Sequence, residues 1–313
     1  MASYIYELYK QFNYRLHFIE KMMAPQRTLN NELPHRPIFI IGPPRSGSTL
    51  LYQTLIQAFN IGYLSNLHCY LFGVPALVEK LRPLDSRSLP NSFSSRHGNT
   101  PGLTGPSECA EFWYRFFPRS PQYVAPDFGD ANFREAFRTA VKAFIQKTAK
   151  PVLFKNLHCS QRLQPIHRAL PEALFIVIKR NITDNAHSLL EMRKKIKGDY
   201  SAWWSVEPYS IDSLRPLPPE KQVVGQINSI YEVIERDKEA IGPEHFLELN
   251  YESFTQDVFQ TIDTIANFFG KFNIDLELRK NTLPVSFKRR SEVRIDPELY
   301  RKLEQTISNQ STD

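Results

Sequence analysis

PIFIIGPPRSGSTLLYQTLIQAF, residues 37–59, is the stretch that decides the fold of this 313-residue chain. It opens with an apolar run, residues 37–42, that ends in a glycine and is typical of a fully buried strand. Leucines at helical spacing then predict a helix over residues 46–59. A loop between a buried strand and a helix is the setting in which glycine-rich loops bind phosphate groups.

The loop itself holds Gly42 and Gly47 at the GxxxxG spacing of a phosphate-binding P-loop. Its backbone N–H groups and the N-terminus of the following helix are expected to converge on one anion. The loop departs from the ATPase pattern, because Ser48 stands where an ATPase has lysine and the cation is Arg45 instead. The sequence therefore predicts an anion site that serves a triphosphate poorly.

Apolar runs alternate with helical patterns along the rest of the chain. Residues 151–155 and 173–179 are typical of buried strands, and the helical stretch between them at 162–170 predicts a right-handed βαβ unit with parallel strands. Other expected elements are helices at 131–148, 182–197, 220–240 and 254–269, a helix start near Pro106, a strand at 245–251, and irregular segments at 82–107 and 199–219. The pattern predicts a leader, residues 1–36, and one α/β domain with lid-like insertions, residues 37–313.

The leader carries a helical pattern over residues 4–23. Its apolar residues fall three or four apart and form one stripe: Ile5, Leu8, Phe12, Leu16, Ile19 and Met23. We expect this stripe to pack on the protein's own surface, which is the usual role of such a stripe. Docking to a membrane or to a partner is the alternative.

Composition limits the partners and the compartment. The net charge of +6 and the pI of about 9.1 suit an anionic ligand, a nucleic acid or a membrane surface. Acidic and basic residues are interleaved, which argues against nucleic acid as a partner. The three cysteines, Cys69, Cys109 and Cys159, match no metal or disulfide pattern and indicate a reducing compartment. With neither a signal peptide nor a membrane span expected, we predict a cytoplasmic protein, at most peripheral to a membrane.

A second anion site is expected at the end of the strand 173–179. Arg180 follows this strand, and Ser188 comes eight residues later on the expected helix. Ligands of open α/β sheets bind at the carboxyl ends of strands, where an arginine fork and a hydroxyl can hold one phosphate.

Together the two sites resemble those of a known family. PPRSGSTLL, residues 43–51, resembles the 5′-phosphosulfate loop of sulfotransferases that use PAPS (3′-phosphoadenosine 5′-phosphosulfate), and RNITDNAHS, residues 180–188, resembles their 3′-phosphate motif. The resemblance spans about residues 37–270 and is greatest to the bacterial and Golgi-type branch. One departure is Asn181-Ile182, where the family has Asp-Pro. The resemblance implies a P-loop nucleotide-binding three-layer sandwich with a mostly parallel sheet, PAPS as donor, PAP as product, and no requirement for a metal.

The resemblance also implies roles for individual residues. Arg180 and Ser188 are expected to bind the 3′-phosphate, and Tyr251 to contact the adenine. Lys288, in the basic run 288–290, closes over the nucleotide or is part of an ordinary solvated patch. The residues expected to bind the 5′-phosphosulfate are Arg45, Ser46, Gly47, Ser48 and Thr49.

Sulfuryl transfer needs a cation on the leaving oxygen and one general base. Arg45 is the first candidate for the cation and Lys155, at the end of the strand 151–155, is the second. For the base, Glu108 comes first, then His158.

Glu111, one turn after Glu108 on the same expected helix face, is the third candidate base, and His97 is a distant fourth. We predict that the acceptor is a carbohydrate or glycolipid hydroxyl, with a small phenol or alcohol as the alternative. Aromatic residues that could form its walls, or simply pack in the core, are Phe112, Trp113, Tyr114, Trp203, Trp204 and Tyr209.

Other functions are less compatible with the sequence. The strand 173–179 is followed by Arg180 and the strand 245–249 by Asn250, so neither supplies the aspartate that holds Mg²⁺ in P-loop ATPases. This weighs against a P-loop small-molecule kinase, which is the enzymatic alternative. A non-catalytic nucleotide-binding protein is a second alternative. A nucleic-acid-binding module is a third, and the oligomeric state is left open.

Overall fold

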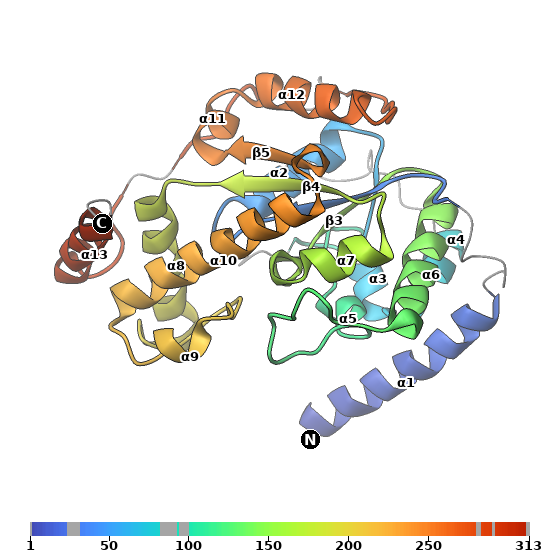
Figure 1. Ribbon diagram of the computed structural model, residues 1–313, viewed down its shortest axis with the longest axis horizontal. Helices are drawn as coiled ribbons and strands as arrows, with labels where there is room; N and C mark the ends of the chain where they lie inside the picture. The colour runs from blue at the N-terminus through green and yellow to red at the C-terminus, as the bar shows by residue number, and fades with distance from the viewer. Residues whose placement is uncertain are drawn as a thin grey trace.

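A five-stranded parallel sheet lies at the centre of the computed structural model (Figure 1), which describes residues 2–23, 32–81, 93, 100–279, 283–289 and 292–310. The strand order is β2–β3–β1–β4–β5. The strands are β1 (Pro37–Ile41), β2 (Gly62–Tyr63), β3 (Val152–Lys155), β4 (Leu174–Lys179) and β5 (Phe246–Asn250). The predicted parallel arrangement is confirmed, and β1 lies between β3 and β4, so that the predicted βαβ unit spans it.

Helices cover both faces of this sheet (Figure 1). Alternate residues of β1 point to opposite sides, with Phe39 in one core and Ile38 in the other. The helices packed on the Ile38 side are α2 (Ser48–Ala58), α11 (Tyr251–Gln256) and α12 (Val258–Gly270). Those on the Phe39 side include α6 (Ala131–Thr148), α7 (Leu163–Ala169) and α10 (Pro219–Ile241). The predicted α/β three-layer sandwich is thus confirmed.

The remaining helices differ in part from the predicted ones. They are α3 (Asn66–Tyr70), α4 (Pro75–Leu81), α5 (Ala110–Trp113), η2 (Leu157–Gln161), α8 (Ile182–Lys197), α9 (Ile211–Leu214), η3 (Pro243–His245) and α13 (Pro297–Gln310). The helix predicted over 254–269 is two helices, because the Asp257 side chain accepts a hydrogen bond from the Gln260 N–H and starts α12 afresh. The unpredicted α13 packs on α8 and α10 through the buried Leu303.

The N-terminal helix α1 (Ala2–Met23) contacts the domain through polar groups (Figure 1, lower right). The Tyr9 hydroxyl donates to the carbonyls of Cys69 and Tyr70, at 2.9 and 3.0 Å. The Gly73 N–H donates to Asn13 Oδ1 at 3.1 Å, and Asn13 is buried. These contacts fix which side of α1 faces the domain.

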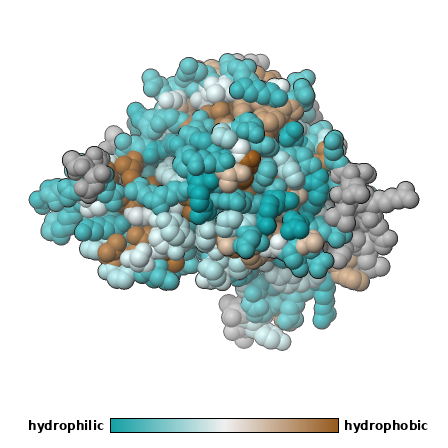
Figure 2. Space-filling view, viewed as in Figure 1, coloured by the Kyte–Doolittle hydropathy of each residue, from teal (hydrophilic) through white to brown (hydrophobic). Residues whose placement is uncertain are grey.

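Of the predicted apolar stripe of α1, Leu16 is half-buried, and the side chains of Ile19 and Met23 lie outside the described residues. Ile5, Leu8 and Phe12 are 60%, 48% and 55% exposed, so the prediction that they pack on the protein's own surface is wrong. The reason is that Tyr9 and Asn13, which periodicity alone does not single out, take the buried side. Within the described part of the chain, no helix combines the length and apolarity needed to cross a membrane. The face seen in Figure 2 is mainly hydrophilic, with hydrophobic residues in small patches.

Candidate functional site

The loop after β1 has the backbone shape of an anion cradle. Gly42 and Gly47 have φ of 146° and 95°, and Arg45 has φ of 67°, a left-handed conformation that L-residues adopt only when their surroundings hold it. A Cβ on Gly47 would lie 2.2 Å from the ring of Tyr251. Position 47 therefore requires glycine both for its φ and for the close approach of that ring.

Two buried polar residues outside the loop hold it in this shape. The Ser160 hydroxyl accepts from the Gly42 N–H at 3.0 Å and donates to the Gly42 carbonyl at 3.2 Å. The Asn185 amide donates to the Pro44 carbonyl at 2.7 Å. Sequence patterns did not single out Ser160 or Asn185, because a lone serine and a lone asparagine carry no signal without the tertiary structure that brings them to the loop.

The two predicted anion sites come together. Arg180 Nη1 donates to the Arg45 carbonyl at 2.8 Å, and Arg45 Nε donates to Ser188 Oγ at 3.0 Å. The Arg180 guanidinium also lies over the Tyr251 ring, 4.7 Å from its centroid. The loop, the end of β4 and the start of α8 thus face one region.

Two polar atoms of this region fit an anionic ligand. Among the residues that the structure describes, Ser46 Oγ and Arg180 Nε are buried and have no hydrogen-bond partner. A buried donor without a partner is costly, and a phosphate oxygen is the acceptor that best suits an arginine. The residues present therefore fit a ligand with phosphate groups.

Lys155 and Glu108 form an ion pair next to the loop. Lys155 is 3% exposed, ends β3, and donates to Thr49 Oγ1 at 3.1 Å. Glu108 precedes α5, and its carbonyl accepts from Trp113 Nε1 at 2.9 Å and from Asn156 Nδ2 at 3.2 Å. A buried ammonium thus lies between a loop hydroxyl and a carboxylate, which is a pairing of cation and base beside an anion site.

Glu111 lies apart from this pair. Its carboxylate pairs with Arg119 and accepts from the Tyr6 hydroxyl of α1 at 2.5 Å. The prediction that Glu108 and Glu111 share one helix face is wrong, because α5 begins only at Ala110 and Cys109 before it is left-handed, with φ of 45°. The other candidate base, His97, lies outside the described residues.

His158 lines the same pocket as Glu108 but is much less basic than an ordinary histidine. Its Nδ1 is 3.0 Å from the Tyr114 hydroxyl. Burial, reinforced by the positive charge of Arg162, lowers the pKa of His158 from 6.5 to about 4. His158 is therefore a neutral hydrogen-bonding group near neutral pH and a weak base.

One pocket joins most of these features; of the predicted donor residues, the buried Ser46 and Ser188 are not among its lining residues. Its lining residues are Pro44, Arg45, Gly47, Ser48, Thr49, Leu50, Glu108, Lys155, Leu157, His158, Arg180, Trp204, Ser205 and Tyr251. Leu50, Leu157 and Ser205 had not been identified from the sequence. Lys288 is exposed and is not among the lining residues.

The predicted aromatic walls divide between pocket and core. Trp204 lines the pocket, and Tyr114 reaches it through His158. Phe112 and Trp113 are buried in the core, each 1% exposed. Tyr209 is exposed and donates to Glu232 at 2.8 Å.

Comparisons with a family model and with curated proteins identify the same family. The model described as the sulfotransferase family matches residues 37–271. Two curated relatives, the omega-hydroxy-beta-dihydromenaquinone-9 sulfotransferases Stf3 of Mycobacterium bovis and Mycobacterium tuberculosis, are each 26% identical over 81% of this chain and 67% of their own length.

Solved structures share the fold. The sulfotransferase STF9 from Mycobacterium avium matches with a TM-score of 0.55 and 14% identity, over 95% of this chain and 73% of that one. The sulfotransferase STF1 from Mycobacterium tuberculosis matches with a TM-score of 0.50 and 16% identity, over 85% of this chain and 74% of that one.

Proposed function

Because this chain belongs to the sulfotransferase family, we propose which of its residues carry out the reaction and what kind of acceptor they serve. The chain is a PAPS-dependent sulfotransferase, and sulfuryl transfer from PAPS to an acceptor hydroxyl is its reaction. The single observation that carries the residue assignment is the Lys155–Glu108 ion pair, which lies directly beside the hydroxyl of Thr49 in the first turn of α2.

The donor side of the pocket consists of residues 42–49 with Arg180, Ser188 and Tyr251. In our proposal the loop amides, Arg45 and the loop hydroxyls bind the 5′-phosphosulfate. Arg180 and Ser188 bind the 3′-phosphate, and Tyr251 contacts the adenine. The convergence of Arg45, Arg180 and Ser188 supports one ligand that carries two phosphate groups.

The acceptor side consists of Glu108, His158, Trp204 and Ser205, and Lys155 lies on the border between the two sides. The acceptor oxygen attacks the sulfur in line with the oxygen that bridges sulfur and phosphorus. As the new oxygen–sulfur bond forms and the old one breaks, Glu108 takes the hydroxyl proton. Lys155 and Arg45 stabilise the negative charge that collects on the leaving phosphate.

His158 has a supporting role in this proposal. Its pKa of about 4 makes it a poor proton acceptor at neutral pH. It is instead a neutral hydrogen-bond partner for the acceptor. Cations of the protein itself offset the developing charge, so we propose that no metal ion is required and that a chelator leaves the rate unchanged.

We propose an apolar alcohol as the acceptor class. The walls beside the reacting groups include Leu50, Leu157 and Trp204, which favour an apolar group next to the hydroxyl. The curated relatives are named for a menaquinone that carries an omega-hydroxyl, which supports the same class. The carbohydrate or glycolipid acceptor expected from the family resemblance remains a prediction.

One experiment separates these acceptor classes. The protein is incubated with PAPS labelled in its sulfuryl group and with either a lipid extract or a water-soluble glycan extract of the source cell. We expect the label to enter the lipid fraction. Label in the glycan fraction alone would overturn the apolar acceptor, and failure of the protein to bind PAP by isothermal titration would overturn the donor-site assignment.

A further inference from the structure

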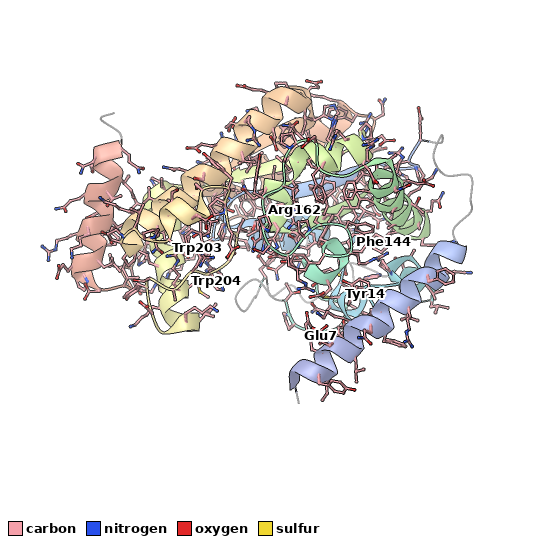
Figure 3. All side chains as sticks on the ribbon, turned by 60° about the horizontal axis from the view of Figure 1, so that its bottom comes forward. Glu7, Tyr14, Phe144, Arg162, Trp203 and Trp204 are labelled. Atoms are coloured by element: carbon pink, nitrogen blue, oxygen red, sulfur yellow. The ribbon has the colours of Figure 1, made fainter. Side chains whose placement is uncertain are left out.

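The segment over residues 199–210 brings Trp204 and Ser205 into the pocket. The Glu207 N–H donates to Gln122 Oε1 at 2.9 Å, and the Gln122 carbonyl accepts from Arg162 Nε at 3.0 Å. The Arg162 guanidinium in turn lies over the Tyr114 ring, whose hydroxyl meets His158. These contacts connect the segment to the acceptor side of the pocket. In Figure 3, Trp203 and Trp204 lie beside α8 and α10 on the side that faces the centre of the molecule.

The backbone is left-handed at the residue after Trp204. Ser205 has φ of 69°, a conformation that a serine keeps only when its neighbours hold it. It turns the chain between Trp204, which lines the pocket, and Val206, which is fully buried in the core. The direction of the Trp204 ring therefore depends on what holds Ser205.

Gln226 of α10 holds both sides of this turn. Its Nε2 donates to the Trp204 carbonyl at 3.2 Å and to the Val206 carbonyl at 2.6 Å. Gln226 is fully buried, so these two bonds replace water for all the groups involved. One amide group thus clamps the two carbonyls that flank Ser205.

Arg193 of α8 fixes the orientation of that amide. Arg193 Nη2 donates to Gln226 Oε1 at 3.0 Å. A guanidinium can only donate, so the amide atom that faces it must be the oxygen, and the amide nitrogen must face Trp204 and Val206. Arg193 also lies over the Trp203 ring, 4.8 Å from its centroid, and is fully buried.

Gln222, one helical turn earlier on α10, repeats the arrangement away from the pocket. Its Oε1 accepts from Arg193 Nη1 at 2.6 Å. Its Nε2 donates to the carbonyls of Arg215 and Leu217, at 2.9 and 2.8 Å. Arg193 thus orients two glutamines, of which only Gln226 holds residues of the pocket.

We propose that Trp204 is the specificity-determining wall for the acceptor, and that Gln226 is the residue that positions it. The indole is a large, flat, apolar surface with a fixed direction, and it favours an alcohol carried on a planar ring or an apolar chain. This inference rests on the proposed function, because it assumes that Glu108 and His158 mark the acceptor side.

The test uses the full chain with PAPS as donor and 2-naphthol as acceptor probe. The Gln226→Met variant keeps the side-chain volume and removes the clamp. We expect it to raise the KM for 2-naphthol about tenfold, as does Trp204→Ala, because the probe loses its stacking surface. The KM for PAPS and the Kd for PAP should stay within about twofold of wild type, because neither residue belongs to the donor side.

Gln222→Met is the matched control. It removes the same kind of buried amide from the same arginine, but it frees carbonyls outside the pocket. We expect it to leave the KM for 2-naphthol within about twofold of wild type. Adding Ser205→Gly to Gln226→Met should lower the raised KM for 2-naphthol about threefold, because glycine adopts the left-handed turn without the clamp.

Several outcomes would overturn the inference. An equal rise in KM for Gln226→Met and Gln222→Met would assign both glutamines a general structural role. An unchanged KM for Trp204→Ala would remove Trp204 from the acceptor wall, as would failure of 2-naphthol to bind a wild-type protein that binds PAP. Failure of the wild-type protein to bind PAP would instead refute the proposed donor site.

Discussion

The donor side and the acceptor side of the pocket are built in different ways. The donor side is formed where β1 and β4 end, by the six-residue loop 42–47, the first turn of α2 and the helix that follows β4. The acceptor side collects Glu108 and Trp204 from two connections and His158 from the short helix η2. The first is a property of local sequence, whereas the second exists only after distant segments have packed.

This difference has a functional meaning. A loop at the end of a buried strand, closed over by Arg180 and Tyr251, presents the same groups to any ligand with the same phosphates. The proposed acceptor residues lie on connections and on the short helix η2, which can change without disturbing the sheet. We expect changes on the two sides to separate donor affinity from turnover and acceptor affinity.

The largest expected effect is on turnover alone. Glu108→Gln keeps the shape of the side chain but cannot take a proton, so kcat should fall by about a thousandfold. The Kd for PAP should stay within about twofold, because the carboxylate is not part of the donor side. Steady-state kinetics and isothermal titration measure the two quantities separately.

Glu111→Gln is the matched control for that change. Glu111 pairs with Arg119 on the α1 side of α5 and is not part of the pocket lining. Its variant should keep a kcat within about twofold of wild type. Normal turnover in Glu108→Gln would refute the base assignment, and loss of turnover in Glu111→Gln would move the base there.

The next largest effect is on donor affinity. Arg180→Ala should weaken PAP binding about a hundredfold, because a charged, bidentate phosphate partner is lost. Adenosine 5′-monophosphate lacks the 3′-phosphate, so its Kd should rise much less. Titration of both nucleotides into both proteins gives the ratio that tests this. Equal losses for the two nucleotides would show that Arg180 does not bind the 3′-phosphate.

The sequence indicates the residues of the proposed donor side more directly than those of the proposed acceptor side, because the former follow from local patterns. The spacing of Gly42 and Gly47, and the position of Lys155 at a strand end, are local features that place residues before any tertiary contact is known. The surroundings of Glu108 depend on the left-handed Cys109 and on bonds from Trp113 and Asn156, which no periodicity reveals.

The apolar stripe of α1 also shows that periodicity does not reveal tertiary contacts. Its spacing correctly predicted a helix but not the side that packs, because two hydrogen-bonding residues, Tyr9 and Asn13, decide the contact. Ser160 and Asn185 support the phosphate loop from distant segments, and single polar residues of this kind give no pattern to recognise.

A smaller expected effect is the pH dependence of stability that comes from His158 on the acceptor side. The folded-state pKa of His158 is about 4, below the 6.5 of an unfolded histidine, so the unfolded chain binds more protons between these values. The contribution of His158 to stability should therefore be complete above about pH 6.5 and fall toward pH 4, by on the order of 3 kcal/mol in all and about 2 kcal/mol at pH 5. His158→Gln should show a correspondingly shallower loss in urea unfolding at pH 7 and pH 5.

Repeating the urea unfolding with saturating PAP tests whether His158 is coupled to the donor side. Because His158 lies outside the donor side, PAP should stabilise the wild-type and His158→Gln proteins by the same amount at each pH. An identical pH dependence in the two proteins would show that His158 is not the residue responsible. A stabilisation by PAP that differs between them would couple His158 to the donor side.

The smallest expected effects come from a pair of buried asparagines, one on each side of the pocket. Asn185 donates to the Pro44 carbonyl of the phosphate loop, and Asn156 donates to the Glu108 carbonyl. Each bond is worth about 1 kcal/mol, which corresponds to about a fivefold change. Asn185→Ala should therefore raise the Kd for PAP about fivefold with little change in kcat, while Asn156→Ala should lower kcat about fivefold with PAP binding unchanged.

The two variants control for each other, because each removes an amide donor from one backbone carbonyl. Asn156→Ala also removes the acceptor of the His158 N–H, within the same acceptor side. Equal free energies of unfolding for the two variants would show that both destabilise the protein to the same extent. Their different effects on PAP binding and kcat would then reflect which side of the pocket each asparagine supports. If each variant changed both the Kd for PAP and kcat by similar factors, the donor side and the acceptor side would be coupled and not independent. The separate effects expected here follow from geometry, because the Asn185 side chain donates to the loop and the Asn156 side chain holds the segments of Glu108 and His158.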